Sequence, residues 1–462
     1  MEWGENWMSN SPETNGMDRM RPIAMNERSM SWFSTLFLWL GSNVVVTTVF
    51  SGMLFVPDMA YPKALTIIII GTLVGGIPLI LMGNIGTRTG LPTMILARGA
   101  FGQRGAVLPT AVNTLVLIGW SWVQAYMGAL SLNQAVFYLT GYTNINLFTI
   151  LTEALVVLLA MYGHRVIESA EKFIVSLMVI LVVIVFGYMF IKFDAGSLIQ
   201  MTTIDNTSIT AIVAFDIVVA TVFSWMLMVS DHNCHCKTEK GGMIGTYFGF
   251  STATIIAMTL GATVSGFSLL NNMTRTYDPT VLIGESNPVF GLVAALVIFI
   301  SVVSTNTMVL YSATISYLAI FKKQRFWKVA LTIGIICICG ALLKDWLLSN
   351  FQGFLIMIGS LFIPVVSIML TDYYLLKRSL YDASEIISGE NKLYWYRNGI
   401  NYVAYISFII GAGFSYYFTY VQPLSIGTTI VTFLLTCVVY SGLMKVTGKI
   451  RVQEESKESE VI

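Results

Sequence analysis

The amino-acid sequence predicts an all-α integral membrane protein that crosses the bilayer about twelve times. Of its 462 residues, 55% are hydrophobic and only 11% are charged, and the mean hydropathy is +0.74. A soluble domain carries about 25% charged residues, because its surface faces water. A chain with fewer than half of these charges must turn most of its surface toward lipid. This excludes soluble enzymes, nucleic-acid-binding proteins and disulfide scaffolds.

Apolar runs of helical length supply the predicted spans. A bilayer core about 30 Å thick needs about 20 apolar residues per helix, and the runs lack the alternation of a barrel strand. They lie at 31–56, 64–84, 107–138, 146–163, 173–191, 210–230, 242–270, 288–318, 328–343, 352–375, 399–418 and 425–444. We expect one transmembrane domain, residues 31–447, between an N-terminal tail (1–30) and a C-terminal tail (448–462).

The distribution of Lys and Arg predicts that both termini lie in the cytoplasm. If successive spans alternate in direction from a cytoplasmic N-terminus, 22 of the 26 basic residues fall on the cytoplasmic side. An excess of this kind is typical of cytoplasmic loops. The polar N-terminus also lacks the apolar stretch of a cleavable signal peptide. We therefore expect a multi-pass protein of the plasma or inner membrane.

The first span has small and polar residues at its centre, Gly41, Ser42 and Asn43. Such residues weaken a helix and offer carbonyl groups and an amide. Interrupted helices of this kind form ion and substrate sites in secondary transporters. The alternative is a close crossing of two helices at small residues.

The third span places Trp120 and Gln124 four residues apart, on one face of a helix. An indole beside a carboxamide suits a flat heteroaromatic ring, because the ring stacks on the indole while the amide bonds its edge. The alternative is a Trp packed against lipid or a neighbouring helix.

The fourth and sixth spans contribute carboxylates. Asp216 lies about a third of the way into the sixth span, which also contains Trp225. Its role is proton coupling or recognition of a substrate amine, or it is a residue wetted by an outer vestibule. Glu153 lies near the outer end of the fourth span, where we expect an interfacial charge.

The eighth span aligns the hydroxyl groups of Ser301, Ser304 and Thr305 on one face, beside Asn306. A cluster of neutral oxygens suits a hard monovalent cation. The alternative is that each hydroxyl bonds to a carbonyl of its own helix.

The segment His232-Asn233-Cys234-His235-Cys236 raises a different class of function, a membrane-embedded metal protein or enzyme. No second Cys/His pair is present to complete a tetrahedral site, so we expect a short polar cap at a cytoplasmic helix end. The sequence also lacks paired intramembrane carboxylates and a selectivity-filter repeat. We expect neither an enzyme nor a resident cofactor.

From about Arg21 to about Leu443, the sequence resembles the nucleobase:cation symporter-1 family, also called the purine-cytosine permease family. Its most specific mark is the Arg-x-x-Phe-Gly-x-x-Gly pattern that begins at Arg98. The other blocks are residues 22–32, Gly119-Trp120 with Gln124, residues 304–306 with 311–313, and residues 362–374 with 396–401.

The resemblance implies a leucine-transporter-like fold. In this fold, spans 1–5 and spans 6–10 form two inverted five-helix repeats, spans one and six are broken, and two extra helices follow. The implied activity is import of a nucleobase-like ring with Na⁺ or H⁺ by alternating access.

The resemblance also implies a substrate site and an ion site. Trp120 and Trp225 would enclose the base, and the amides of Gln124, Asn43 and Asn306 would bond its edge. Na⁺ would lie between carbonyl groups around Gly41 and Ser42 and the hydroxyl groups of Ser304 and Thr305, with Ser301 on the same face. Asp216 is the candidate for proton coupling.

The sequence departs from the family pattern around the sixth span. Residues 218–226 have no Gly or Pro to mark a break, and the usual Asp-Tyr-x-Arg-Tyr motif is replaced by residues 231–235. The unwinding point therefore stays open. The spacing from Trp225 to Asp231 favours a cytosine- or purine-like substrate, with the thiamine precursor hydroxymethylpyrimidine second and an allantoin- or hydantoin-like compound as a further alternative.

Overall fold

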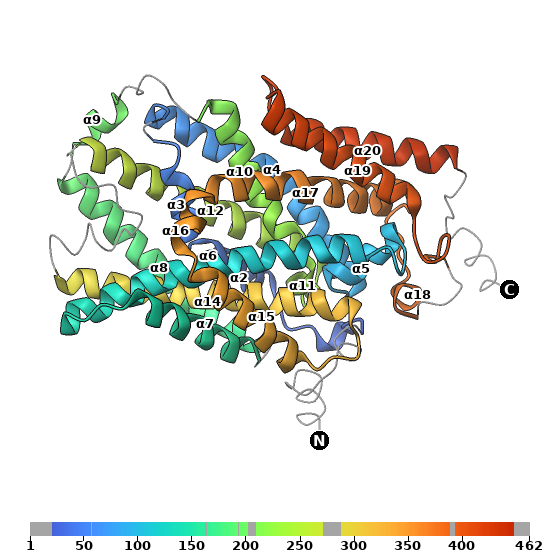
Figure 1. Ribbon diagram of the computed structural model, residues 1–462, viewed down its shortest axis with the longest axis horizontal. Helices are drawn as coiled ribbons and strands as arrows, with labels where there is room; N and C mark the ends of the chain where they lie inside the picture. The colour runs from blue at the N-terminus through green and yellow to red at the C-terminus, as the bar shows by residue number, and fades with distance from the viewer. Residues whose placement is uncertain are drawn as a thin grey trace.

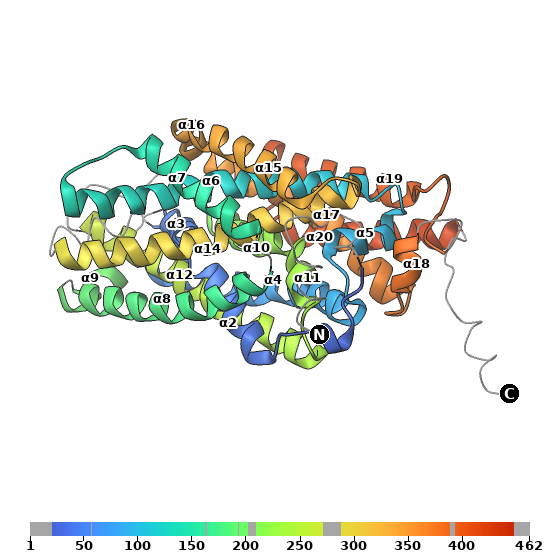
Figure 2. The same ribbon diagram turned by 90° about the horizontal axis from the view of Figure 1, so that it is seen from below.

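The computed structural model describes residues 21–56, 58–161, 164–192, 194–201, 209–270, 288–388 and 393–447. Within these ranges the regular elements are helices, and the long ones run roughly side by side along one axis of a bundle (Figures 1 and 2). The helices are α2 (Trp32–Asn43), α3 (Val46–Met53), α4 (Tyr61–Thr89), α5 (Thr93–Phe101), α6 (Val107–Thr140), α7 (Ile145–Met161), α8 (His164–Lys192), α9 (Ala195–Ile199), α10 (Ala211–Met226), α11 (Val229–Asn233), α12 (Glu239–Leu270), α14 (Pro288–Ile320), α15 (Phe326–Ala341), α16 (Lys344–Ser349), α17 (Phe351–Leu370), α18 (Ala383–Ser388), α19 (Tyr402–Tyr416) and α20 (Thr429–Val446).

The predicted all-α class is confirmed, because each predicted span coincides with a helix or a helix pair. Among the described residues, six helices are long and apolar enough to cross a membrane, and the bent pair α2 and α3 makes a seventh. Four shorter apolar helices lie within α7, α8, α10 and α15, and α19 occupies the predicted eleventh span. Residues 1–20 and 448–462, most of the predicted tails, lie outside the described residues.

The first span is broken where the sequence predicts an interruption. α2 ends at Asn43, α3 begins at Val46, and the two axes differ by 55°. Val45, between them, has an extended backbone (φ −133°, ψ 154°). Gly41, Ser42 and Asn43 are weak helix formers, and the β-branched Val44 and Val45 that follow favour an extended chain. The break leaves carbonyl groups without a helical partner.

The sixth span is also interrupted, although no Gly or Pro marks the position. α10 ends at Met226 and α11 begins at Val229, and Met228 between them is non-helical (φ −129°, ψ −6°). The break therefore lies just after the stretch 218–226. It follows directly on Trp225, which stands in the last turn of α10.

Close backbone contacts fix the broken first span against α12. A Cβ atom on Gly261 would lie 1.9 Å from the Val49 carbonyl oxygen, and one on Gly249 would lie 2.4 Å from the Leu36 carbonyl oxygen. Only residues without a side chain allow helices to approach this closely. α12 is therefore a continuous support for both halves of the first span.

Other helix pairs complete the bundle. α6 packs along α14, and Figure 2 shows α14 between α7 and α8, in agreement with their contacts. α19 and α20 pack together against α17 at one edge (Figure 1). α19 and α20, the last two helices, thus lie beside the first ten spans and are not part of that core.

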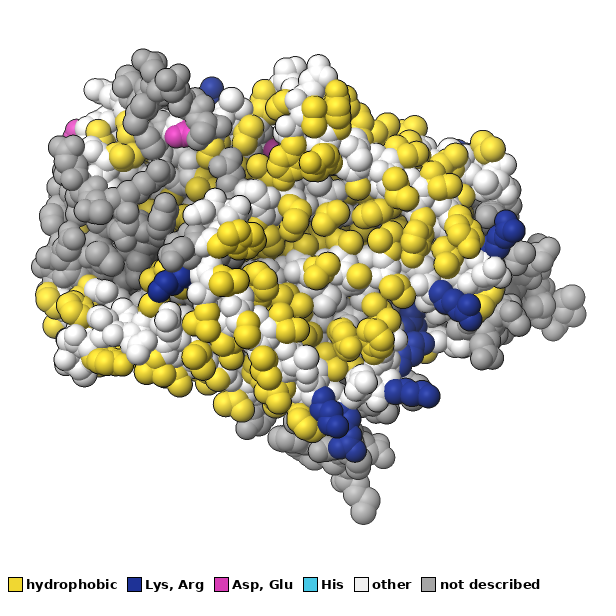
Figure 3. Space-filling view, in the orientation of Figure 1, with side chains coloured by type: hydrophobic (Ala, Val, Ile, Leu, Met, Phe, Trp, Pro, Cys, Tyr) yellow, Lys and Arg dark blue, Asp and Glu magenta, His cyan; other side chains and the backbone are white. Residues whose placement is uncertain are grey.

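The surface is that of a membrane protein. Hydrophobic side chains cover the middle of the face in Figure 3, and Lys and Arg gather mainly at its right-hand and lower right edge. On α4, the side chains of Ile69, Ile70, Leu73, Val74 and Ile77 are exposed. In water such a surface would be costly, and in a bilayer it faces hydrocarbon.

Candidate functional site

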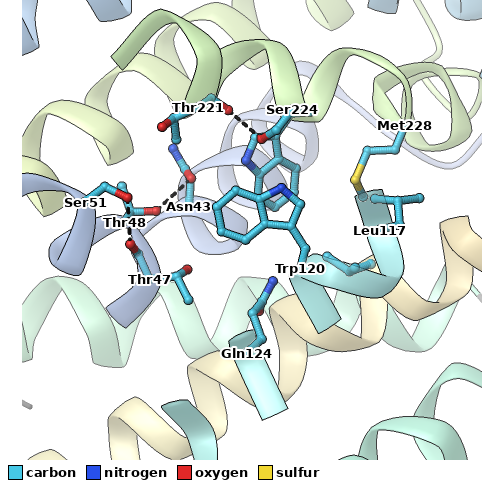
Figure 4. A pocket seen from close by; sticks show the side chains of 12 residues that line it. Asn43, Thr47, Thr48, Ser51, Leu117, Trp120, Gln124, Thr221, Ser224 and Met228 are labelled. Atoms are coloured by element: carbon cyan, nitrogen blue, oxygen red, sulfur yellow. Dashed lines mark hydrogen bonds between the residues drawn. The ribbon is translucent and has the colours of Figure 1, made fainter. Parts of the chain in front are cut away.

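A small cavity lies at the two helix breaks. Its walls come from α2 and α3, from α6, from α10 and the break that follows it, and from Val309 of α14. Among the described residues it is lined by neutral side chains alone, which are Asn43, Thr47, Thr48, Ser51, Leu117, Trp120, Gln124, Thr221, Ser224, Trp225, Met228 and Val309 (Figure 4). A cavity without a charged wall favours a neutral ligand, because a charged group would lose its hydration without gaining an ionic partner.

α6 presents Trp120 and Gln124 to this cavity, one helical turn apart (Figure 4). The Trp120 indole packs edge-on against Phe354 (5.5 Å between ring centroids) and Phe351 (6.2 Å). Gln124 is only 2% exposed. Two atoms, Trp120 Nε1 and Gln124 Oε1, are buried without a hydrogen-bond partner in the described structure. A donor and an acceptor are thus left open at one cavity, and buried polar atoms of this kind ordinarily have partners.

Trp225 forms the cavity wall on α10. Its ring meets Trp39 and Phe250 edge to face, at centroid distances of 5.9 and 6.0 Å. Trp39 is itself anchored, since its Nε1 donates to Asn233 Oδ1 at 3.0 Å. A second indole is therefore positioned from behind by a rigid aromatic layer.

Asn43 lines the cavity, but its amide already serves the helix break. Its Oδ1 accepts a hydrogen bond from Thr48 Oγ1 at 3.0 Å, and its Nδ2 donates to Thr254 Oγ1. These bonds join the end of α2 to α3 and to α12. The geometry therefore gives Asn43 a positioning role.

The sequence predictions did not include the hydroxyl residues on the two helices beside the breaks. Thr47, Thr48 and Ser51 lie on α3, and Thr221 and Ser224 lie on α10. Ser51 and Ser224 donate to the carbonyl oxygens of Thr47 (3.0 Å) and Thr221 (2.6 Å). Their spacing could have identified them in the sequence, because polar residues three and four apart on an apolar helix share a face.

A second polar region lies where α14 meets the first-span break. Ser301 Oγ donates to the Val44 carbonyl oxygen at 3.2 Å. Thr305, one turn further along α14, is fully buried, and its Oγ1 has no hydrogen-bond partner among the described residues. Ser304 is also buried. The structure thus brings Ser301 to the break, with Val44 as the carbonyl in direct contact.

Asn306 and Glu153 form a pair outside the cavity. Asn306 Nδ2 donates to Glu153 Oε2 at 2.7 Å, and Ser121 Oγ donates to Glu153 Oε1 at 3.0 Å. The expectation that Glu153 is an interfacial charge was wrong, because the residue is 0% exposed. α6 and α14 cover it, and their residues are distant from it in sequence. The structure also does not place Asn306 at the cavity that contains Trp120.

Asp216 lies at a different place from the other predicted site residues. Its carboxylate accepts hydrogen bonds from the backbone N–H groups of Thr428 (2.8 Å) and Thr429 (3.1 Å), at the start of α20. It lines a separate cavity between α10, α17, α19 and α20. This geometry is that of a helix cap.

The segment from His232 to Cys236, where α11 ends, is largely buried. Cys236 Sγ lies 3.3 Å from Thr35 Oγ1, and Met30 pairs with the segment through its backbone, Met30 N to His235 O at 2.9 Å. Arg28 Nη1 donates to the Cys236 carbonyl oxygen at 3.3 Å. Among the described residues, no group of three or more His, Cys, Asp or Glu is placed to bind a metal. The segment therefore holds the start of the first span in place, through its contacts with Arg28, Met30 and Thr35.

A protein-family model matches residues 22–442, and its description is permease for cytosine/purines, uracil, thiamine, allantoin. A purine-uracil permease of Arabidopsis thaliana is 23% identical over 85% of this chain and 70% of its own length. A hydantoin permease of Microbacterium maritypicum is 22% identical over 86% of this chain and 83% of its own.

Solved structures match nearly the whole chain, and one of them serves for comparison. It is Mhp1, described as a nucleobase-cation-symport-1 family transporter in a closed conformation with bromovinylhydantoin bound. The TM-score is 0.82 at 20% identity, over 96% of this chain and 98% of that one. The predicted leucine-transporter-like arrangement of spans is confirmed at the level of the fold.

Proposed function

The chain belongs to the family of permeases for cytosine/purines, uracil, thiamine and allantoin, and from this premise we propose how its own residues carry out transport. The protein is a secondary active transporter that imports a nucleobase or a related flat N-heterocycle with a coupling cation, by alternating access. The substrate occupies the cavity between the broken first span, α6 and α10.

The open polar atoms on α6 are the observation that carries this proposal. Gln124 Oε1 is a buried acceptor without a partner in the described structure, and it suits a ring N–H group. The indoles of Trp120 and Trp225 offer flat faces for stacking, and the neutral walls suit an uncharged ring. An N–H group beside a carbonyl or ring nitrogen is common to nucleobases and hydantoins, so this chemistry supports the class of substrate.

Within that class, we propose a cytosine- or purine-like base as the substrate. Hydroxymethylpyrimidine and an allantoin- or hydantoin-like compound are the alternatives, and competition for uptake of a labelled base by this panel ranks them. Relatives of similar identity are named for purine and uracil and for hydantoin.

We propose that the coupling cation is Na⁺, bound where α14 meets the first-span break. The Ser301 hydroxyl already touches the Val44 carbonyl, and Ser304, Thr305 and the carbonyl groups of Gly41 and Ser42 are the remaining oxygen ligands. Broken helices with free carbonyl groups bind Na⁺ in secondary transporters. The unpartnered Thr305 Oγ1 supports this arrangement.

The proposed location is the plasma or inner membrane, with the 1–30 and 448–462 tails in the cytoplasm. The support is the placement of 22 of 26 basic residues on one side by the alternating spans. We propose that the protein's partners are the substrate, the cation and the bilayer. The proposal includes no nucleic acid, no resident cofactor and no enzymatic activity.

Substitution of Trp120 tests the site. Stacking of a base on an aromatic ring contributes about 1–3 kcal/mol, so Trp120→Ala should weaken the apparent affinity for the base by about 5- to 150-fold. Gln124→Leu should weaken it by about 2- to 12-fold through loss of one hydrogen bond. The measurement is initial uptake of labelled cytosine, uracil and hypoxanthine into proteoliposomes.

The matched control is Trp346→Ala, because Trp346 lies on α16 and is 60% exposed. It should leave uptake unchanged. If Trp120→Ala transported every base with the affinity of the unmodified protein, the cavity would not be the substrate site.

A further inference from the structure

Glu153 is a carboxyl group in the interior of the bundle, and the transport mechanism above gives it no task. It lies in the middle of α7 and is 0% exposed. Its two oxygens accept from Ser121 Oγ of α6 and Asn306 Nδ2 of α14. The Cys337 thiol of α15 also lies against it. Three helices therefore enclose the carboxyl.

The surroundings of Glu153 contain no described positive charge. Ser121, Asn306 and the Cys337 thiol are neutral, and the described side chains of α8 that could reach α7, from Phe173 to Ile191, include no Lys or Arg. The ion pairs found in the described structure, Arg21–Glu27 and Arg88–Glu239, lie elsewhere. A buried carboxylate without a cation is costly, so sealing this site from water favours binding of a proton.

The hydrogen bonds of Glu153 connect the two helices that carry the proposed sites. Ser121 follows Trp120 in α6, and Asn306 follows Thr305 in α14. α6 and α14 also pack against each other more extensively than any other pair of described helices. A change in the charge of Glu153 therefore acts directly on the helix that contacts the substrate and on the helix beside the first-span break.

Asn306 has the chemistry to respond to such a change. The ionised carboxylate only accepts hydrogen bonds, and Asn306 Nδ2 serves it as donor. A proton on Oε2 turns that oxygen into a donor, which then needs an acceptor. Asn306 Oδ1 is buried without a partner in the described structure, so a flip of the amide provides one.

We propose that Glu153 is a proton-binding site that couples a proton to transport in addition to the proposed Na⁺, with Ser121 and Asn306 as the groups that transmit its charge state. The carboxyl takes up a proton from the outer side before the substrate site is sealed, and it releases that proton on the cytoplasmic side when the bundle opens there. This role rests on the proposed transport function, and it assigns to α7 the coupling that the sequence suggested for Asp216.

The test measures accumulation of a base driven by a pH gradient alone. Purified protein in proteoliposomes, with equal Na⁺ on both sides and a clamped potential, receives the labelled base that it exchanges fastest among cytosine, uracil, hypoxanthine and hydantoin. One proton per cycle allows accumulation up to about tenfold per pH unit. Glu153→Gln should abolish this accumulation and retain exchange of internal for external base without a gradient.

Asp216→Asn is the matched control, since it removes the other carboxylate of the predicted site without touching α7. It should accumulate base as the unmodified protein does. Accumulation by Glu153→Gln equal to that of the unmodified protein would overturn the role of Glu153, as would a failure of the unmodified protein to accumulate base under the pH gradient. Both results leave the transport function intact, whereas failure of the unmodified protein to exchange any base contradicts that function itself.

If Glu153→Gln loses exchange because its fold is disturbed, Glu153→Asp serves as the second test. Aspartate keeps a titratable carboxyl, so it should restore both exchange and pH-driven accumulation. If Glu153→Asp exchanges base but does not accumulate it, or if it does neither, a proton-binding role is contradicted.

Discussion

Some buried polar side chains in this protein already have hydrogen-bond partners, and others have none among the described residues. Those with partners have a structural role, and those without are candidates for binding the substrate. Asn43 has both amide atoms engaged by Thr48 and Thr254. Trp120 Nε1 and Gln124 Oε1 have none in the described structure. An unpaired buried polar atom is destabilising by about 1–3 kcal/mol, so its persistence in a cavity is explained by a ligand that pairs with it.

Asp216 belongs to the structural groups, and this assignment can be tested. Replacement of a carboxylate that caps a helix reduces stability by about 0.5–2 kcal/mol. Asp216→Ala should therefore lower the thermal unfolding temperature of the purified protein, and Asp216→Asn should lower it less, because an amide oxygen still accepts from Thr428 or Thr429. The measurement is thermal unfolding in detergent. Equal unfolding temperatures for all three proteins would refute a capping role.

Sequence inspection misplaced Glu153 and did not foresee the partners of Asp216, and both have one cause. Glu153 bonds to residues 32 and 153 positions away in sequence, and Asp216 bonds to residues 212 and 213 positions away. No local pattern reveals such partners. Depth along a span was therefore a poor guide to the environment of either carboxylate.

At the scale of elements, the sequence predicted most where the physical cause was local. Span positions followed from hydropathy, and the first break followed from Gly41, Ser42 and Asn43. The sixth break could not be located, since residues 218–226 contain no helix breaker and α10 stops only at Met226. No local signal fixes this break. Its position is set by packing, because α10 packs against α4 and α17, and α11 packs against α4.

The junction of the first break with α14 gives the prediction for the cation. Combined Ser304→Ala and Thr305→Ala substitutions should weaken activation of uptake by Na⁺ by about 10–100-fold, a range found when groups supporting metal sites are removed. The measurement is uptake against Na⁺ concentration at fixed pH. Thr314→Val is the control, because the Thr314 hydroxyl bonds to the Leu310 carbonyl of its own helix. An unchanged Na⁺ dependence in the double variant would remove the cation from this junction.

At the scale of the whole molecule, two interrupted spans meet at one cavity while continuous helices support them. α12 contacts both halves of the first span at Gly249 and Gly261, and α6 packs along α14. Such an arrangement lets the broken spans move relative to a rigid frame, which is how alternating access operates in transporters of this kind.

Coupled accumulation of a flat heterocycle is the activity that distinguishes this transporter from a channel or an enzyme, and it can be measured directly. Purified protein is placed in proteoliposomes with an inward Na⁺ or proton gradient, and the steady-state ratio of internal to external labelled base is recorded. Coupled transport predicts a ratio well above one that falls to one when an ionophore dissipates the gradient. A ratio of one for every base under both gradients would contradict it.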